Sequence, residues 1–428
     1  MEEDMDEKGM KKAEGRRWPS LSENERERRW GRVRAFMRAR GLDCLVVFGL
    51  KGRESFDRYL TNDRTGGIAI FPLEGDLVHL TWAAFDIPAH FESGLRGEAA
   101  WVNDMRLGAN GAGVVKVLRE KGYEKAHVGV VGLAIWAPGE MDGYVPYTGW
   151  VHVMEHLPHA TFSNVSDEFA RMVFVKSEEE LQLVRKAAEN SELAAEAMIK
   201  LARPGVGENE LYAAGMYQLF LNGSTGSPSP YITPMIIHSG PDNPGWGAPM
   251  WLLRGQPPRI IKNGDIIQAE IFSRYGGVEA QGQLAIAVGP VDPVNIECAA
   301  IARRSYNIGL ETLRAGKKFG EVVEAMEEPL KQAGAWHVTP LIHSLNPLCW
   351  VSETNSRFEK MPGIEGYKDV IVTPVIGGDM EIQPGTIWEL EPNACLGKHK
   401  VNIGGTVIAT EGRAEELNRL CTEMRIVG

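Results

Sequence analysis

The sequence predicts an α/β domain at the amino-terminal end, followed by a larger α+β domain. Up to about residue 165, short apolar runs typical of buried strands alternate with helical segments, an order that favours an α/β domain. Further along, helices and strands come in separate blocks, which favours α+β. The chain has 428 residues, so each domain can bury a core of its own.

The amino-terminal elements follow from their local residues. A charge-rich stretch, residues 1–20, is predicted to be a disordered tail in front of a domain spanning 21–165. An amphipathic helix is expected from Ser20 to about Arg40, because Gly41 is placed to end it. Buried strands are expected at 45–49, 67–72, 76–82 and 128–132, with helices between them, one of which lies near 113–121.

The second domain, predicted for residues 166–428, opens with a strong helix signal. Ser177 can cap a helix, and Glu180, three residues on, completes a capping box. Pro204 and the glycine after it break this helix. The remaining elements are expected to be a helix from near 208, strands over 260–290, helices over 293–334, and then strands and loops that end in a short helix at Glu415.

Composition excludes several classes of function. The formal net charge of −11 gives no field that attracts phosphates, so no nucleic-acid partner is expected. No run approaches the roughly 18 apolar residues of a membrane span, and the charged first residues lack the apolar core of a signal peptide. The five cysteines are scattered and lack CxxC spacing, as is typical of free thiols in a reducing compartment. We therefore expect a cytoplasmic protein, not inserted in a membrane, that acts on a small molecule.

The most informative stretch runs from Asn263 to Gln281. It reads as two strands joined at a Gly276–Gly277 turn, which predicts a hairpin. Glu270 and Gln281 lie eleven residues apart on the two strands. A hairpin of this kind suits two metal-binding carboxylates, but only one of the two positions carries an acid.

Five motifs, in order, give the chain a family resemblance: FVKSEEE at 174–180, RPGVGENE at 203–210, NGDII at 263–267, LEPN at 390–393 and VIATEG at 407–412. Over roughly residues 25–428 the chain resembles the creatinase/aminopeptidase family, which includes methionine and Xaa-Pro aminopeptidases, prolidase and creatinase. The resemblance implies a pita-bread fold for the second domain and a creatinase- or prolidase-like first domain. It also implies a homodimer in which the amino-terminal domain lies near the neighbouring active site.

The resemblance also implies which residues occupy the metal positions. Metallopeptidases of the family hold two divalent ions with two Asp, one His and two Glu, and the ions activate a bridging water. The first Asp corresponds to Glu270 and the second to Gln281, whose neutral amide cannot bridge two ions. The His corresponds to His343 and the first Glu to Glu391, whereas the last Glu falls within 402–405, where no ligand exists. Neither a dinuclear centre nor a cofactor is therefore expected.

Acid–base chemistry is expected from the ionisable residues that remain. Creatinase works without metal, but its catalytic His would fall near 250–251, where this chain has none. His343 and Glu391 are the first candidates to divide the acid and base roles, the alternative being a pair that only hydrogen-bonds within the sheet. Glu270 is a third acid, a partner for a cationic substrate, or a salt-bridge partner of an arginine. His238 is either a substitute proton shuttle or a satisfied core histidine.

Substrate-binding candidates gather in neighbouring loops. Four aromatic residues suit a planar ring or a quaternary cation, although such residues are also common core fillers. Two arginines suit a substrate carboxylate, but both can instead form surface ion pairs. By resemblance, one of them corresponds to an arginine that creatinase extends into the partner subunit's site. The candidates are Trp246, Trp251, Tyr275, Trp350, Arg64 (the creatinase-like arginine), Arg357 and the hairpin amide Gln281.

Four functions remain open on this basis. The leading hypothesis is a metal-independent hydrolase of the creatinase type, which cleaves a C–N or related C–heteroatom bond in a small molecule by Glu/His acid–base chemistry. The first alternative is a metal-dependent Xaa-Pro dipeptidase or aminopeptidase. The second is a C–S lyase acting on a sulfonium-type substrate, and the third is a non-catalytic binding protein on the same fold.

Overall fold

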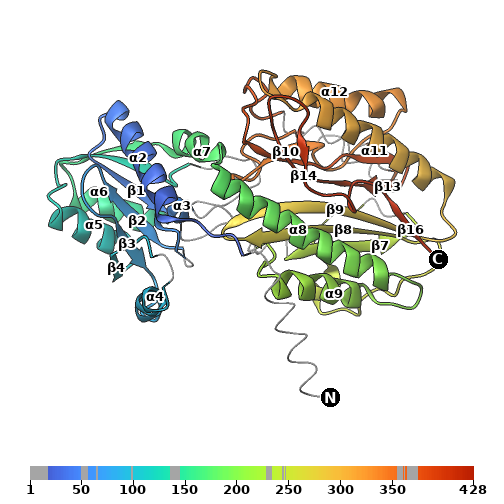
Figure 1. The fold of residues 1–428 in the computed structure, drawn as a ribbon, viewed down its shortest axis with the longest axis horizontal. Helices are drawn as coiled ribbons and strands as arrows, with labels where there is room; N and C mark the ends of the chain where they lie inside the picture. Colours follow the sequence, from blue (N-terminus) through green and yellow to red (C-terminus); the bar gives the residue numbers. More distant parts are fainter. Residues whose placement is uncertain are drawn as a thin grey trace, which may run out of the picture.

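The chain forms two parts, one built on a six-stranded sheet and one on an eight-stranded sheet, joined through α7 (Ser166–Phe174) and α8 (Glu178–Leu201) (Figure 1). No helix in the described part of the chain is long and apolar enough to cross a membrane. Residues 1–17 of the predicted tail lie outside the described residues, and the boundary near 165 stays a prediction. The computed structural model describes residues 18–49, 56–63, 66–97, 100–134, 145–227, 234–242, 245, 247–353, 360, 362–363 and 375–428.

The amino-terminal part has the predicted alternation of strands and helices. Its strands lie in the order β4-β3-β2-β1-β5-β6. The first helix begins after Ser22, whose side chain accepts from the Glu25 N–H, and ends at Gly41 with a φ of 63°. Its elements are α2 (Glu23–Arg40), β1 (Cys44–Phe48), α3 (Asp57–Thr61), β2 (Ile68–Pro72), β3 (Val78–Thr81), α4 (Asp86–Leu95), β4 (Asp104–Leu107), α5 (Gly111–Glu120), β5 (His127–Val131), α6 (Tyr147–His156) and β6 (Thr161–Asn164).

The carboxy-terminal part is α+β, as predicted. The capping box of Ser177 and Glu180 is present at the start of α8. The prediction of a short helix at Glu415 is wrong, because Glu415 and Glu416 pair with β14 and extend the sheet as β15. The sheet order is β10-β11-β14-β9-β8-β7. The elements after α8 are α9 (Glu208–Leu221), β7 (Met235–Gly240), α10 (Met250–Arg254), β8 (Ile266–Tyr275), β9 (Val278–Val288), α11 (Pro293–Thr312), α12 (Phe319–Gln332), β10 (Ile342–Leu345), β11 (Ile387–Leu390), β12 (Asn393–Leu396), β13 (His399–Asn402), β14 (Gly404–Ile408), β15 (Glu415–Glu416) and β16 (Arg425–Val427).

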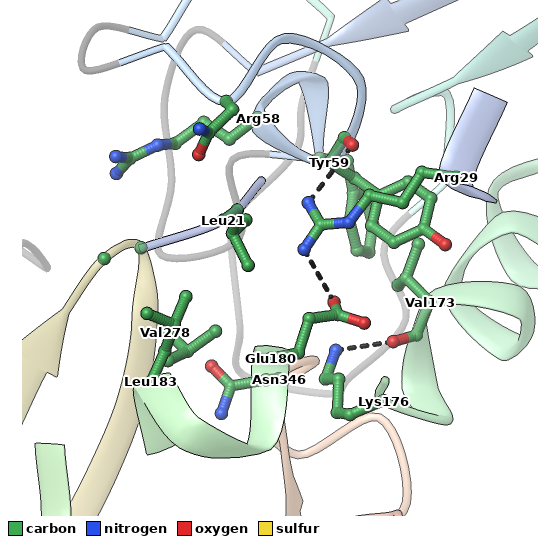
Figure 2. Close-up of a pocket in the computed structure, with 14 residues that line it drawn as sticks. Leu21, Arg29, Arg58, Tyr59, Val173, Lys176, Glu180, Leu183, Val278 and Asn346 are labelled. Carbon is green, nitrogen blue, oxygen red and sulfur yellow. Dashed lines mark hydrogen bonds and ion pairs between the residues drawn. The ribbon is translucent and has the colours of Figure 1, made fainter. Parts of the chain in front are cut away.

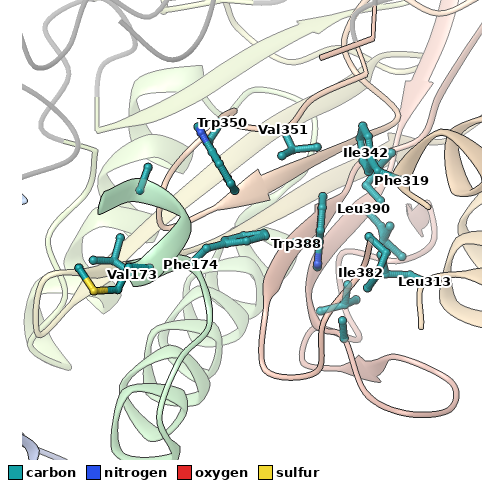
Figure 3. Packing of buried hydrophobic residues seen from close by; sticks show 14 of the residues in the cluster. Val173, Phe174, Leu313, Phe319, Ile342, Trp350, Val351, Ile382, Trp388 and Leu390 are labelled. Carbon is teal, nitrogen blue, oxygen red and sulfur yellow. The ribbon is translucent and has the colours of Figure 1, made fainter. Parts of the chain in front are cut away.

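Aromatic packing on one face of β11 determines which side chains point to the other face. Trp388 stacks on Phe319 with ring centroids 5.2 Å apart and meets Phe174 edge-on at 5.4 Å (Figure 3). Leu390 belongs to the same buried cluster. Successive side chains of a strand point to opposite faces, so Glu389 is directed away from this core.

A buried histidine ties α3 to the amino-terminal sheet. His79 on β3 lies fully buried between two carboxylates, with its Nε2 3.3 Å from Asp57 Oδ2 and its Nδ1 3.3 Å from Asp63 Oδ2. Burial by itself would lower the pKa of His79, but the hydrogen bonds and charges of the two aspartates outweigh this and raise it to about 9. The imidazole is therefore a cation at neutral pH.

Candidate active site

Polar side chains form a band across one face of the long sheet. His343 on β10 lies opposite Glu389 on β11, which lies opposite Thr406 on β14. Glu270 on β8 lies opposite Gln283 on β9, and Gln283 in turn faces β14. Directly opposed residues share a face of a sheet, so all five belong to one continuous band. All five are buried.

His343 and Glu391 form an ion pair within this band. The His343 Nε2 lies 3.4 Å from Glu391 Oε1, and the Nδ1 donates to the Ser344 carbonyl at 3.0 Å. The backbone contact fixes the orientation of the ring and turns Nε2 toward the carboxylate. Burial alone would lower the pKa of His343, but the neighbouring Cys349 and Glu391 side chains more than offset this, and the pKa lies well above its usual value. The two residues predicted to share the acid and base roles are thus in contact.

Neutral amides hold the Glu391 carboxylate in place. Gln283 Nε2 donates to Glu391 Oε2 at 3.1 Å, and Asn402 Nδ2 donates to Gln283 Oε1 at 3.2 Å. The Asn402 backbone N–H donates in turn to Gln268 Oε1 at 3.0 Å. This series of hydrogen bonds orients the Glu391 carboxylate without adding charge, as a positioned acid or base requires.

Glu389 is a further carboxyl group beside the pair. Its Oε2 lies 3.1 Å from Thr406 Oγ1. Complete burial raises the pKa of Glu389 well above its usual value, and the adjacent Glu391 charge adds to this effect although His343 opposes it. Burial therefore favours the protonated form of Glu389.

A buried lysine adds a positive group near the same acids. Lys400 on β13 is 1 % exposed, and its Nζ donates to the Gly245 carbonyl at 2.8 Å. Burial lowers the pKa of Lys400 to about 8, and the charges of Glu391 and Glu270 oppose part of this shift. The ammonium group is thus held within electrostatic reach of both carboxylates.

Three buried oxygen atoms in this region have no hydrogen-bond partner among the described residues. They belong to Glu389 (Oε1), Gln281 (Oε1) and Asn402 (Oδ1). The Gln281 amide is oriented by its own Nε2, which donates to Glu279 Oε1 at 2.9 Å. Buried polar atoms of this kind normally find water or a ligand, because leaving one unpaired costs about 1–3 kcal/mol. The site therefore offers oxygen atoms to a ligand that carries N–H groups.

The second predicted histidine lies at the edge of this face. His238 on β7 is opposite Gln268, two residues from Glu270 on the same side of β8. Its Nε2 donates to the Gly247 carbonyl at 2.6 Å, and burial lowers the pKa of His238. The ring is therefore neutral and fixed by the backbone, and its role as a proton shuttle stays a prediction.

Three of the four residues of the predicted aromatic wall are described, and each packs against a different helix. Tyr275 follows Glu270 by an odd number of residues, so it faces α8 instead of the polar band. Trp251 packs edge-on against Tyr212 of α9, with centroids 5.6 Å apart. Trp350 is a core residue that meets Phe174 at 5.4 Å (Figure 3). Tyr275 and Trp350 are thus core residues, whereas Trp251 is partly buried, and a substrate role for the three stays a prediction. Trp246, Arg64 and Arg357 lie outside the described residues.

Sequence reasoning missed three residues of the site. Glu389 could have been found, because it precedes Glu391 by two residues and strand periodicity places both near one face. Lys400 could have been found in the same way, because it precedes Asn402 by two residues on one strand. Cys349 lies close enough to His343 to affect its pKa, yet no spacing in the sequence indicates this contact. The thiol forms no disulfide, and neither do the other four cysteines, as predicted.

Comparison with known proteins places this architecture in a family. The model of metallopeptidase family M24 matches residues 182–411, which is more than half of the 428-residue chain. The chain belongs to metallopeptidase family M24. Among its M24 relatives, creatinase of Bacillus sp. (strain B-0618) is 20% identical over 400 residues, which cover 90% of this chain and 87% of that protein. Homologues in the family are hydrolases, so the coarse activity of this M24 chain is that of a hydrolase.

Solved structures of M24-type peptidases share the fold along nearly the whole chain. X-Pro aminopeptidase from Thermotoga maritima superposes with a TM-score of 0.71 at 17% identity, covering 93% of this chain and 99% of that one. Xaa-Pro dipeptidase from Bacillus anthracis gives a TM-score of 0.68 at 17% identity, covering 94% and 100%. The two-part pita-bread fold predicted from the motifs is confirmed.

At the positions that the resemblance assigns to the two-metal centre, the residues of this M24 chain do not make a complete donor set. Gln281 offers a neutral amide where a bridging carboxylate is needed. At Gly404, a Cβ atom would lie 1.9 Å from the Leu390 carbonyl oxygen, so the backbone leaves no room for a ligand side chain. Within the described ranges, one group of three His, Cys, Asp or Glu residues brings its ligand atoms within 4.8 Å of one another, and it contains none of the family's metal positions. That group is Glu327, His337 and Glu353.

We expect Gly404→Ala to destabilise the protein by roughly 2–4 kcal/mol, because the new methyl group meets backbone atoms and the residue has a φ of 152° that suits glycine. Urea unfolding measures the loss. Gly412→Ala is the matched control, since a Cβ there meets nothing within 4 Å. Equal stability of the two variants would contradict the close approach at Gly404.

Proposed function

We propose that this protein is a metal-independent hydrolase that cleaves a C–N bond in a small nitrogen-bearing molecule. The observation that carries the proposal is the contact between His343 and Glu391. By the family resemblance, two metal positions near this pair fall on Gln281 and within residues 402–405, where this chain has no acid. The chain has an acid–base pair at this place, but it lacks the full set of ligands for two metal ions. This combination favours proton transfer over metal activation of water.

The unpaired oxygens support a substrate rich in N–H groups. Glu389, Gln281 and Asn402 each present a buried oxygen that lacks a partner in the described part of the chain. Guanidino and amide compounds carry several N–H groups that can reach such acceptors. A site with hydrogen-bond acceptors of this kind also rejects analogues without the matching donors, because the buried oxygens would then stay unpaired.

The geometry supports one assignment of roles. Glu391 takes a proton from an attacking water, whose oxygen bonds to the substrate carbon. His343 gives its proton to the leaving nitrogen as the C–N bond breaks. The proton on Glu391 then returns to His343 across their 3.4 Å contact, which restores both groups.

A metal-dependent Xaa-Pro peptidase is the second candidate. Glu270, His343 and Glu391 still offer two carboxylates and one imidazole, which are ligand types that divalent ions accept. Chelator treatment separates this candidate from the first.

We expect hydrolysis to continue in protein that has been dialysed against EDTA and shown by elemental analysis to hold only traces of metal. The full-length protein is incubated with creatine and other guanidino compounds, with simple amides and with Xaa-Pro dipeptides, and released amine is measured. Activity on a guanidino or amide compound without metal supports the proposal.

Other outcomes identify the alternatives. Loss of activity on dialysis, with recovery in Mn²⁺ or Co²⁺, would identify a metallopeptidase. Turnover of a sulfonium compound would indicate a lyase, and saturable binding without turnover would indicate a binding protein. The cytoplasmic location and the homodimer stay predictions.

A further inference from the structure

A cavity of about 70 Å³ lies at the junction of the two parts, and no residue of the polar band lines it. Side chains from α2, α3 and α8 surround it, and the tip of the β8–β9 hairpin closes one side (Figure 2). Arg29, Arg58 and Lys176 bring three positive charges to its wall, and Glu180 brings one negative charge. Among the described residues that line the cavity, positive charges therefore outnumber negative ones.

Arg58 is the cation of this wall that lacks a counter-ion. Its guanidinium has no hydrogen bond or ion pair with any residue in the described part of the chain, whereas Arg29 is tied to Glu180 at 3.0 Å (Figure 2). A Cβ on Gly277 would lie 3.2 Å from Arg58 Cζ, so the side chain packs against bare backbone at the hairpin tip. Burial lowers the pKa of Arg58 and the positive charge of Arg274 adds to this effect, whereas the charges of Asp57 and Asp63 oppose part of it.

The nearest acids are bound to other groups. Asp57 Oδ2 accepts from the Gly67 N–H at 2.7 Å and lies 3.3 Å from His79. Asp63 Oδ2 lies 3.3 Å from the other nitrogen of the same imidazole. The buried histidine thus holds both aspartates that flank Arg58 in the sequence.

Both carboxylate oxygens of Glu180 also have partners. One of its oxygens pairs with Arg29, while the other accepts from the Ser177 N–H at 2.9 Å and from Arg28 Nη2 at 3.1 Å. The Arg58 guanidinium is half-buried, lies near Arg274, and none of its five N–H donors is hydrogen-bonded to a described acid. Asp57 and Asp63 therefore compensate its charge only from a distance.

We propose that this cavity binds a small oxyanion, a carboxylate or phosphate group, with Arg58 as its main cation. A guanidinium matches both groups, since its paired N–H donors fit two oxygens of either one. The cavity has space for a group of a few atoms but not for a peptide. Because it is lined by elements of both parts of the chain, an oxyanion there links α3 to the β8–β9 hairpin. The site is independent of the chemistry proposed for His343 and Glu391.

Calorimetry on the full-length protein tests this site. Sodium phosphate and sodium acetate are titrated separately at constant ionic strength, with sodium chloride as the balancing salt. We expect saturable binding of one or both oxyanions and none of chloride. Arg58→Met should weaken that binding by roughly tenfold or more, as expected for loss of a charged hydrogen-bond donor. Arg304→Met, which removes an exposed arginine outside the cavity, should leave it unchanged.

Each outcome decides the proposal. Binding of phosphate alone assigns a phosphate site, and binding of acetate alone assigns a carboxylate site. Arg58→Lys keeps the charge but loses the paired donors, so it should weaken binding even if Arg58→Met does not fold. The proposal is overturned if neither oxyanion binds, or if the folded Arg58 variants bind as tightly as the wild type.

Discussion

Glu391→Gln should lower kcat by about 10²–10⁴-fold on the substrate found in the chelator screen, the range associated with one positioned acid or base. The amide keeps the size of the side chain but cannot accept a proton from water. It also removes the negative charge that faces His343 Nε2 at 3.4 Å. Initial rates over a range of substrate concentrations separate the effect on kcat from that on KM.

The matched control for this variant is Glu74→Gln, an identical chemical change at an exposed residue of the amino-terminal part. It should turn over substrate at the wild-type rate. If Glu391→Gln does the same while remaining folded, the acid–base role of Glu391 is excluded, and Glu389 becomes the carboxyl group to test.

His79→Gln should reduce the free energy of unfolding by about 3–5 kcal/mol at pH 7, as happens when one partner of a buried ion pair is removed. The neutral amide leaves Asp57 and Asp63 buried without the cation between them. Urea unfolding followed by circular dichroism gives the loss. His159→Gln, at an exposed position, should have little effect.

The same histidine should make stability depend on pH. Its pKa is about 9 in the folded chain and about 6.5 in the unfolded chain. Its stabilising contribution is therefore complete below about pH 6.5 and is lost as pH rises through 9. Unfolding at pH 6, 7.5 and 9.5 should show a decline in the wild type that is reduced in His79→Gln. Parallel pH profiles would show that His79 is not the cation between the aspartates.

The fold could be predicted because its signals are local. Ser177 and Glu180 indicate the start of α8, and the Gly276–Gly277 turn indicates the β8–β9 hairpin. Strand periodicity also predicts that Glu270 and Gln281 point to the opposite face of the sheet from the residues next to them in the sequence. Glu415 was misjudged because two residues carry too little pattern to distinguish a helical turn from a short edge strand.

The site could be predicted only in part, because it depends on pairings between distant strands. Motifs locate His343 and Glu391, but no spacing reveals that Asn402 supports Glu391 through Gln283, whose partners lie more than 100 residues away. For the aromatic residues, the sequence could not distinguish core packing from substrate binding. Trp350 and Tyr275 are residue types that are common in binding sites. Trp350 is buried against α7 and Tyr275 against α8, so core packing explains both without a ligand.

The pairing of β16 with β9 has a consequence for how the protein is made. Residues 425–427 pair in parallel with residues 286–288, which leave the ribosome 139 residues earlier (425 minus 286). At about 5–20 residues per second, this segment of β9 waits roughly 7–28 s for its neighbour. The sheet that carries the polar band is therefore completed only after residues 425–427 have been made, when the amino-terminal part has already had time to fold.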